Sequence, residues 1–594
     1  MDEKRISAFT ESKLTCEQIL SQGREQAREI LNSLSHQQKT HLFLTADPKN
    51  RMRLLSALDR PKDIVQAVPE EEVYWTIKEI GVRKSLPLLK MTSDDQLHFL
   101  CDVEWWDGET LNLKRMYTWL KALTMCGDAK VSQWLRSFDF DLLALTLKKF
   151  IRVYKPHDDY VDDYGESIDN LPLVTFDGAY FIHFLKKEST DIVRRILAVL
   201  CSLDLDLYRK LMEYIIWGID AEVEYETFQS SQERLDSKGI PEYDEARLIY
   251  CFIPKNERNK LPEKDEITRK TDNIQKSFYP LRLCGKPDLF LTKVLEQIDD
   301  YAVIEDLSMG LARVANKVLV ADHLGINNMT TFKNKLAKTS GIINIGLEIL
   351  SDSDEERAEY ALRHLWMEHI FQVGWSVIID FKRTMEPIID TLKRSSERGL
   401  EIFDFPLKEI LVGIDKPAPM YFTGEDEAQN QSYRDFQSVF ELNTTRDSVE
   451  NAAFLADLIF HKLGLCLPDT DKQAIDYYAE EAYTLKSMLM TALSNRYVHN
   501  VWRVRPLDLE TMRLFLDGAF VNDAKSCEET FERDLALMVA DSVAQMFTDR
   551  QALSFNGFLK QCIKQLEQEY REATEEGYLD IIAFKIIKIH HFSA

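Results

Sequence analysis

The chain has 594 residues, 45% of them apolar and 29% charged, which is the composition of a folded globular protein and not of a disordered chain. Its 99 acidic and 74 basic side chains give a net charge of −25, which repels nucleic-acid phosphates and anionic membrane surfaces and favours a protein or a cation as partner. Nine cysteines lie singly with no pair at CxxC spacing, which argues against zinc ribbons and redox motifs and is typical of reduced thiols in a cytoplasm.

Glycine and proline are scarce, at 21 and 17 residues. Because turns between strands depend on these residues, their scarcity predicts a mainly α fold. The length exceeds what a single hydrophobic core supports, so we expect several helical domains. The longest uncharged apolar stretch, Ile370 to Ile379, is too short to span a bilayer, and the first residues lack the apolar segment of a signal peptide. We therefore expect a cytoplasmic protein without membrane insertion.

After a polar lead-in, a unit recurs in which a short acidic or proline-containing start precedes an amphipathic helix. Apolar side chains recur at i, i+4 and i+7 in the stretches 68–81, 137–150 and 201–215: Val73, Ile77 and Ile80, then Leu143, Leu147 and Phe150, then Leu207, Leu211 and Tyr214. This spacing places each trio on one helical face. Short helices with one apolar stripe need neighbours to cover it, so the pattern predicts a stack of helical hairpins.

Local sequence signals mark where several of these helices begin. Pro69 suits a first helical turn, and Glu70 to Glu72 complement the positive end of the helix dipole. Ser93 with Gln96 is typical of a capping box, as is Ser353 with Glu356.

The stretch Lys155 to Pro172 is strongly acidic and contains six carboxylates, namely Asp158, Asp159, Asp162, Asp163, Glu166 and Asp169. Hard cations such as Mg²⁺ or Ca²⁺ prefer oxygen ligands, so Asp158, Asp159, Asp162 and Asp163 are a candidate metal site. Neither register of a helix–loop–helix Ca²⁺ site fits, however, because the required acids and glycine are not at the right positions. Like charges at this density are also typical of a solvated connector held open by repulsion, which is the interpretation we favour.

The period then changes to two. In Leu173 to Phe184 apolar and polar residues alternate around Asp177-Gly178, a pair that favours a tight hairpin turn, so we predict one small β-hairpin here. Helices resume to about Tyr250. The composition predicts the following segments: a polar lead-in (1–45), a helical-hairpin repeat domain (46–155), the acidic loop, hairpin and further helices (156–252), a charged linker (253–287), a helical domain (288–413), a second linker (414–444) and a C-terminal helical domain (445–594).

Three stretches together resemble a known family. They are "SDDQLHFLCDVEWWDGE" (93–109), "TFDGAYFIHF" (175–184) and "SQERLDSKGIPEYDEARLIYCFIP" (231–254), the last with Arg234, Leu235, Gly239, Pro241, Tyr243, Glu245 and Ala246. The chain, from about residue 40 to 590, is similar to a family of bacterial proteins known only as a domain of unknown function. Residues 48–155 are more distantly similar to the helical-hairpin domain of bacterial magnesium transporters and flagellar rotor switch proteins. The resemblance implies partner binding and brings no catalytic residue or cofactor.

The histidines of "HLWMEH", His364 and His369, are five apart and do not share a helical face, and the spacing is one residue too long for an inverted zinc-protease motif. GxGxxG, GxxxxGK[ST], GxSxG and HExxH are absent. An enzyme without a recognisable motif stays an alternative, with Asn316 and Asp322 of the 288–413 domain as its candidate residues.

Four tryptophans crowd into the repeat region: Trp105, Trp106, Trp119 and Trp134. They are either core residues between short helices, which we favour, or an exposed surface for a protein partner. The sequence as a whole favours a non-catalytic protein-binding or scaffold protein. The alternatives are a divalent-cation-responsive regulator that uses residues 158–169 and an enzyme without a motif. The sequence identifies neither a partner nor an oligomeric state.

Overall fold

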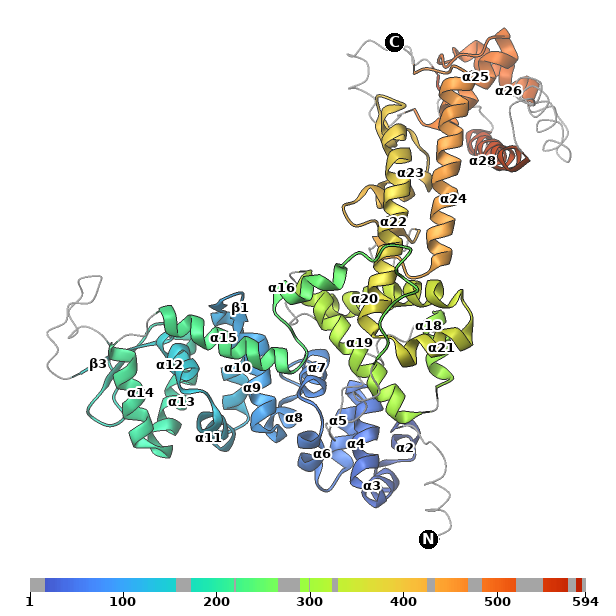
Figure 1. Ribbon diagram of the computed structural model, residues 1–594. Coiled ribbons are helices and arrows are strands. Elements are labelled where there is room, and N and C mark those ends of the chain that lie inside the picture. Colours follow the sequence, from blue (N-terminus) through green and yellow to red (C-terminus); the bar gives the residue numbers. More distant parts are fainter. Residues whose placement is uncertain are drawn as a thin grey trace. The chain divides into compact units, whose positions relative to one another are not determined.

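The computed structural model describes residues 16–155, 172–217, 221–264, 289–298, 300–322, 329–424, 433–467, 483–519, 549–574 and 584–589 (Figure 1). The chain divides into two compact units, Met1–Ser376 and Val377–Ala594. Helices dominate both units, and the strands of the described residues form three two-stranded antiparallel sheets. The prediction of a mainly α fold is therefore confirmed.

The first unit begins with short helices that pack on their neighbours in the chain, as the predicted stack of hairpins requires (Figure 1). They are α2 (Cys16–Leu20), α3 (Arg24–Ser33), α4 (His36–Thr45), α5 (Pro48–Ala57), α6 (Pro61–Ala67), α7 (Glu70–Ile80), α8 (Leu86–Met91), α9 (Asp94–Trp105), α10 (Leu113–Met125), α11 (Asp128–Ser137), α12 (Phe140–Lys148), α13 (Thr190–Leu203), α14 (Leu205–Trp217) and α15 (Ala221–Ser237). The described helices of the second half of this unit are α16 (Tyr243–Ala246), the 3₁₀ turn η3 (Arg247–Tyr250), α18 (Phe290–Glu296), α19 (Tyr301–Ala321), α20 (Met329–Ser351), α21 (Glu355–His364) and the start of α22 (Met367–Arg394).

The residues predicted to be buried in the stack are mostly buried, but α7 and α12 are covered on more than the one predicted face, because all positions from 72 to 77 and from 142 to 147 are buried. Val73 and Ile77 of α7 and Leu143 and Leu147 of α12 are buried. In α14 the buried face is rotated by about one residue from the predicted trio: it comprises Tyr208, Leu211, Met212 and Ile215. The predicted capping box of α9 is present, with the Ser93 hydroxyl accepting from the Gln96 N–H at 3.2 Å and the Gln96 side chain accepting from the Ser93 N–H at 2.9 Å.

The second predicted capping box is wrong. Ser353 lies in the left-handed region, at φ 61°, and the cap of α21 is the next residue, Asp354, whose carboxylate accepts from the Arg357 N–H at 2.9 Å. Both serine and aspartate cap helices well, and the sequence places them side by side. The pattern therefore located the helix start to within one residue and chose the wrong neighbour.

All four tryptophans of the repeat region are core residues, between 0% and 6% exposed. Trp105 and Trp134 pack edge to face with ring centroids 6.1 Å apart, and both contact Phe138. These four rings are thus not the exposed partner surface that was the alternative hypothesis.

The predicted hairpin forms only in part. β4 (Phe181–Phe184) pairs with β3 (Ile151–Tyr154), and a single bridge joins Val174 to Ile182 across the turn. Gly178 has φ +74°, as the turn requires, and the Asp177 carboxylate accepts from the N–H groups of Ala179 and Tyr180 at 2.9 and 3.1 Å. The other two sheets are β1 (Trp106–Asp107) with β2 (Thr110–Leu111), and β5 (Tyr421–Phe422) with β6 (Tyr433–Arg434).

Two long helices of the first unit cross at glycines. A Cβ atom on Gly374 of α22 would lie 1.9 Å from the carbonyl oxygen of Ile342, and one on Gly346 of α20 would lie 2.0 Å from that of Ile370. No side chain fits between backbones this close, so the crossing depends on both glycines. Helix α20 also contacts the hairpin stack, where the Phe332 ring stacks on Trp75 at 3.7 Å.

Residues 253–264, the start of the predicted charged linker, contain no helix and lie against α21 and α22. The Ile253 N–H donates to the Ser376 hydroxyl at 2.8 Å, and the Lys264 N–H donates to the His364 carbonyl at 2.7 Å. The rest of that predicted linker, up to residue 287, falls outside the described residues.

The second unit contains the remainder of α22, η5 (Gly399–Ile402), α23 (Leu407–Asp415), α24 (Val439–Ala456), η6 (Asp457–Lys462), α25 (Leu485–His499), α26 (Leu509–Ala519) and α28 (Asp549–Thr574). Helix α24 contacts both α23 and α28 (Figure 1). The core of the second unit includes Phe381 and Phe436, whose rings pack edge to face with their centroids 5.6 Å apart.

The three glutamates that begin α7 have three different environments. Glu70 pairs with Lys238 at 2.8 Å, and Glu72 pairs with Arg51 at 2.7 Å, with both side chains of the second pair fully buried. Burial, and then repulsion from Glu70 and Glu72, raises the pKa of Glu71 to about 8.

This raised pKa predicts a pH-dependent gain from Glu71→Gln. Because the folded-state pKa lies above the unfolded value, the folded state holds the proton longer, so Glu71 lowers stability progressively as the pH rises from about 4.5 to about 8. We expect the free energy of unfolding of Glu71→Gln, relative to that of wild type, to rise by about 1–2 kcal/mol between pH 5 and pH 9. Urea unfolding at both pH values measures it, and a difference that does not change with pH contradicts the assignment.

Candidate functional site

The acidic loop with Asp158, Asp159, Asp162 and Asp163 lies outside the described residues, so its cation binding stays a prediction. Within the described ranges, no group of three or more His, Cys, Asp or Glu side chains is placed to hold a metal ion. The chain is described again on either side of the loop. Lys155, directly before it, and Tyr180, in the hairpin that follows it, both bond to the Glu213 carboxylate of α14.

The two candidate residues of the motif-less enzyme are not brought together. The Asn316 amide donates to the Gly239 carbonyl at 3.2 Å, whereas Asp322 contacts Tyr250, Lys335 and Lys338. Six residues of helix place their side chains about 120° apart around the helix axis, which is why they face different neighbours.

Asp322 is the centre of a polar cluster formed by η3, the end of α19 and the start of α20. Its Oδ1 accepts from the Tyr250 hydroxyl at 2.8 Å, and its Oδ2 accepts from Lys335 at 2.5 Å and Lys338 at 3.0 Å. Lys338 also donates to the Tyr250 hydroxyl at 2.8 Å and lies over the rings of Tyr250 and Trp375. Burial acts to raise the pKa of Asp322, but attraction to Lys338 and the hydrogen bonds from both lysines outweigh it and lower that pKa below its usual value. Asp322 is therefore an anion that neutralises one of two neighbouring cations.

His364 and His369 do not share a site. The His364 ring stacks on Tyr360 at 4.0 Å, and its Nδ1 lies 2.9 Å from the Tyr360 carbonyl oxygen. Burial lowers the pKa of His369, which favours its neutral form. The two residues belong to different helices, α21 and α22, and the break between them explains why a metal motif does not form.

Helix α15 lies along the hairpin stack beside α9 and α12 (Figure 1). From residue 223 to 237, where the side chains of α15 are described, three are buried: Thr227, Ser231 and Leu235. The main anchor is Asp102 of α9, which is 3% exposed and accepts from the Ser231 hydroxyl at 2.9 Å and from two guanidinium nitrogens of Arg234 at 2.8 Å each. Bidentate pairs of this kind fix orientation as well as adding energy, so α15 presents a defined outer face.

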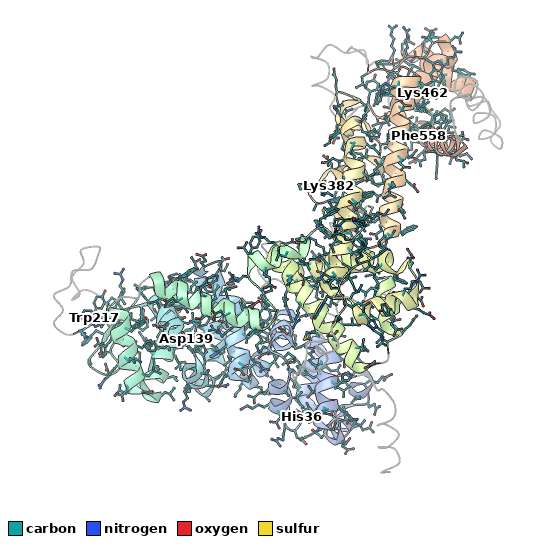
Figure 2. All side chains as sticks on the ribbon, in the orientation of Figure 1. His36, Asp139, Trp217, Lys382, Lys462 and Phe558 are labelled. Carbon is teal, nitrogen blue, oxygen red and sulfur yellow. The ribbon has the colours of Figure 1, made fainter. Side chains whose placement is uncertain are left out.

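The outer face of α15 comprises Tyr225, Glu226, Glu233 and Asp236. At 100° per residue these four positions lie within about 100° of one another and opposite the buried residues. All four are exposed, Tyr225 by 51%, and the three carboxylates form no ion pair within the described part of the chain. Trp217, at the end of the preceding helix, is 80% exposed, and its indole N–H donates to Glu213 at 3.1 Å (Figure 2). The Trp217 ring already has the Lys155 ammonium 5.9 Å from its centroid, so the accessible ring on the acidic face is that of Tyr225. Acidic side chains that share a face with an accessible aromatic ring suit a cationic partner.

Sequence reasoning missed this face, although one signal was available. Residues 221–246 contain eight acidic and two basic side chains, and both basic ones, Arg234 and Lys238, form ion pairs with the hairpin stack, at Asp102 and Glu70. A helix whose few cations are already paired leaves most of its carboxylates without a partner in the same chain. What the sequence did not contain was the partner of Arg234, since Asp102 lies 132 residues earlier.

None of the described helices combines the length and apolar character needed to cross a bilayer. Comparison with known proteins gives one family match: a family model described as a family of unknown function (DUF6178) covers residues 28–589. No curated protein and no solved structure matches the chain. The resemblance to magnesium transporters and rotor switch proteins therefore stays an expectation from sequence.

Proposed function

We propose that this chain, which belongs to the DUF6178 family of unknown function, is a non-catalytic binding protein whose outer α15 face receives a basic segment of a protein partner. The observation that carries the proposal is the row of three exposed carboxylates, Glu226, Glu233 and Asp236, which have no ion pair within the described residues and share one face of α15 with the exposed ring of Tyr225. Lysine or arginine side chains of a partner would gain ion pairs there, and a cation over Tyr225 would gain a further attraction.

Support also comes from how α15 is held. A binding face contributes affinity when it is ordered before the partner arrives, because less conformational freedom is then lost. The Asp102 contacts to Ser231 and Arg234, together with Lys149 to Glu224 at 3.1 Å and Lys238 to Glu70 at 2.8 Å, hold α15 along its length. The chain's net charge of −25 adds long-range attraction for a basic partner.

Site-specific photocrosslinking in native cells tests the proposal. A benzoylphenylalanine in place of Tyr225 is expected to capture one predominant protein through a segment rich in lysine and arginine. The double substitution Glu226→Lys/Glu233→Lys should reduce that adduct at least about tenfold, since it replaces two attractive contacts by repulsive ones. Raising the salt concentration in lysate should weaken the same adduct.

Glu25→Lys/Glu29→Lys on α3 is the matched control, because it also reverses two exposed, unpaired carboxylates on one helix of the same unit. It changes net charge equally and should leave the Tyr225 adduct unchanged. An adduct that survives reversal at Glu226 and Glu233, or that both reversals reduce alike, would show that general acidity and not this face recruits the partner.

A further inference from the structure

The cluster around Asp322 holds more cationic donors than the protein satisfies. Lys335 makes a single bond, to Asp322, and Lys338 makes two, to Asp322 and to the Tyr250 hydroxyl. An ammonium group carries three N–H donors, so two donors of Lys335 and one of Lys338 have no acceptor in the described protein. The Lys338 side chain is only 8% exposed, so water reaches its remaining donor poorly, whereas Lys335, at 23%, is partly open to solvent and to a ligand.

The charge of the cluster is unbalanced in the same direction. Two ammonium groups face one carboxylate, which leaves one unit of positive charge in a partly buried place that solvent screens less than the open surface. The surrounding helix contributes no compensation nearby: α20 carries Lys333, Lys335 and Lys338 near its start, and Lys333 is occupied by Glu79 at 2.9 Å. Such an excess of ammonium groups over carboxylates is unusual in a chain whose net charge is −25. Buried hydrogen-bond donors also ordinarily have acceptors.

We propose that Lys335 and Lys338 bind a phosphate group of a small-molecule ligand, with Asp322 as the internal anion that competes for the same two ammonium groups. Lysine binds phosphate as a point charge, whereas a carboxylate ligand is better matched by the planar fork of arginine, and the described cluster contains no arginine. The ring of Trp375, over which the Lys338 ammonium lies at 5.9 Å, and that of Tyr250 hold this lysine in place.

The competition gives the proposal a property that a purely structural ion-pair cluster lacks. Removing the charge of Asp322 frees both lysines, so Asp322→Asn should tighten phosphate binding even though it removes two ion pairs from the folded protein. A structural cluster would only lose stability and would gain no affinity for any anion. The two interpretations therefore predict opposite responses to added phosphate.

Titration of the full chain with inorganic phosphate, followed by calorimetry and by thermal unfolding at constant ionic strength in chloride, is the test. We expect saturable phosphate binding, about tenfold tighter in Asp322→Asn and about tenfold weaker in Lys335→Gln. Lys333→Gln, on the same helix and paired with Glu79, is the matched control and should bind as wild type does.

The absence of saturable binding in both wild type and Asp322→Asn would overturn the site. Equal binding by Lys335→Gln and Lys333→Gln would overturn it as well, and this comparison uses partly exposed lysines, so it still decides if Asp322→Asn does not fold. Acetate at the same concentration should bind at least about tenfold more weakly than phosphate, and equal binding of both anions would contradict the phosphate class.

Discussion

Gly374→Ala is expected to prevent α20 and α22 from packing and to destabilise the first unit by at least about 3 kcal/mol. The added Cβ would lie 1.9 Å from the Ile342 carbonyl oxygen and 2.9 Å from the backbone nitrogen of Gly346. Both are backbone atoms of a helix and cannot turn aside as the end of a side chain can, so the two helices must separate. Gly346→Ala should have a similar effect, since its Cβ would lie 2.0 Å from the Ile370 carbonyl oxygen. Urea unfolding followed by tryptophan fluorescence measures it, because every tryptophan except Trp502 lies in this unit.

Gly557→Ala in α28 is the control substitution. Gly557 also lies inside a helix, but among the described residues no atom beyond its own stretch of helix lies within 4 Å of the position its Cβ would occupy. Alanine favours a helix over glycine by about 1 kcal/mol, so this change should leave the second unit equally or more stable. If Gly374→Ala and Gly557→Ala proved equally harmless, the close crossing of α20 and α22 would be wrong.

The helix crossing shows where sequence reasoning stopped. Gly346 and Gly374 lie on different helices, and neither has a spacing partner within its own helix that would indicate a close approach. By contrast, the burial of Val73, Ile77, Leu143 and Leu147 and the capping box at Ser93 depend on local spacing and were predicted correctly, although α7 and α12 are buried on more than that one face. Local periodicity records which side of a helix is buried but not which helix covers it.

The same limit explains what was found and missed at the sites. Asp322 was selected from the sequence as a polar residue of an amphipathic stretch, yet its partners Tyr250 and Lys338 come from elements 72 and 16 residues away. The pairing with Asn316 assumed that a shared helix means a shared site, and the two side chains instead contact different elements. Polar networks are assembled by tertiary contacts, so composition can nominate their members but not their neighbours.

Apart from the helix crossing, the largest loss of stability from a single substitution is expected at the ion pair of Arg51 and Glu72. Both side chains are fully buried, 2.7 Å apart. The guanidinium also donates to the carbonyl oxygens of Leu44 and Ala46 at 2.7 and 3.0 Å and to the Thr76 hydroxyl at 2.7 Å, so it joins α4, α5 and α7. A buried carboxylate without its cation is costly, since water no longer solvates it. We expect Arg51→Met to destabilise the first unit by about 3–5 kcal/mol in urea unfolding.

A double-substitution cycle separates the charge from the packing. Arg51→Met/Glu72→Gln removes the stranded charge as well, so it should recover about 1–3 kcal/mol relative to Arg51→Met alone. Arg28→Met is the matched surface control: its pair with Asp59, at 2.6 Å, has side chains 66% and 54% exposed, and its loss should cost less than about 1 kcal/mol. Strict additivity of Arg51→Met and Glu72→Gln would mean that the two charges do not depend on each other. The loss of stability in Arg51→Met would then come from its hydrogen bonds to the Leu44 and Ala46 carbonyl oxygens. A coupling between the two substitutions is expected only if each buried charge depends on the other for its neutralisation.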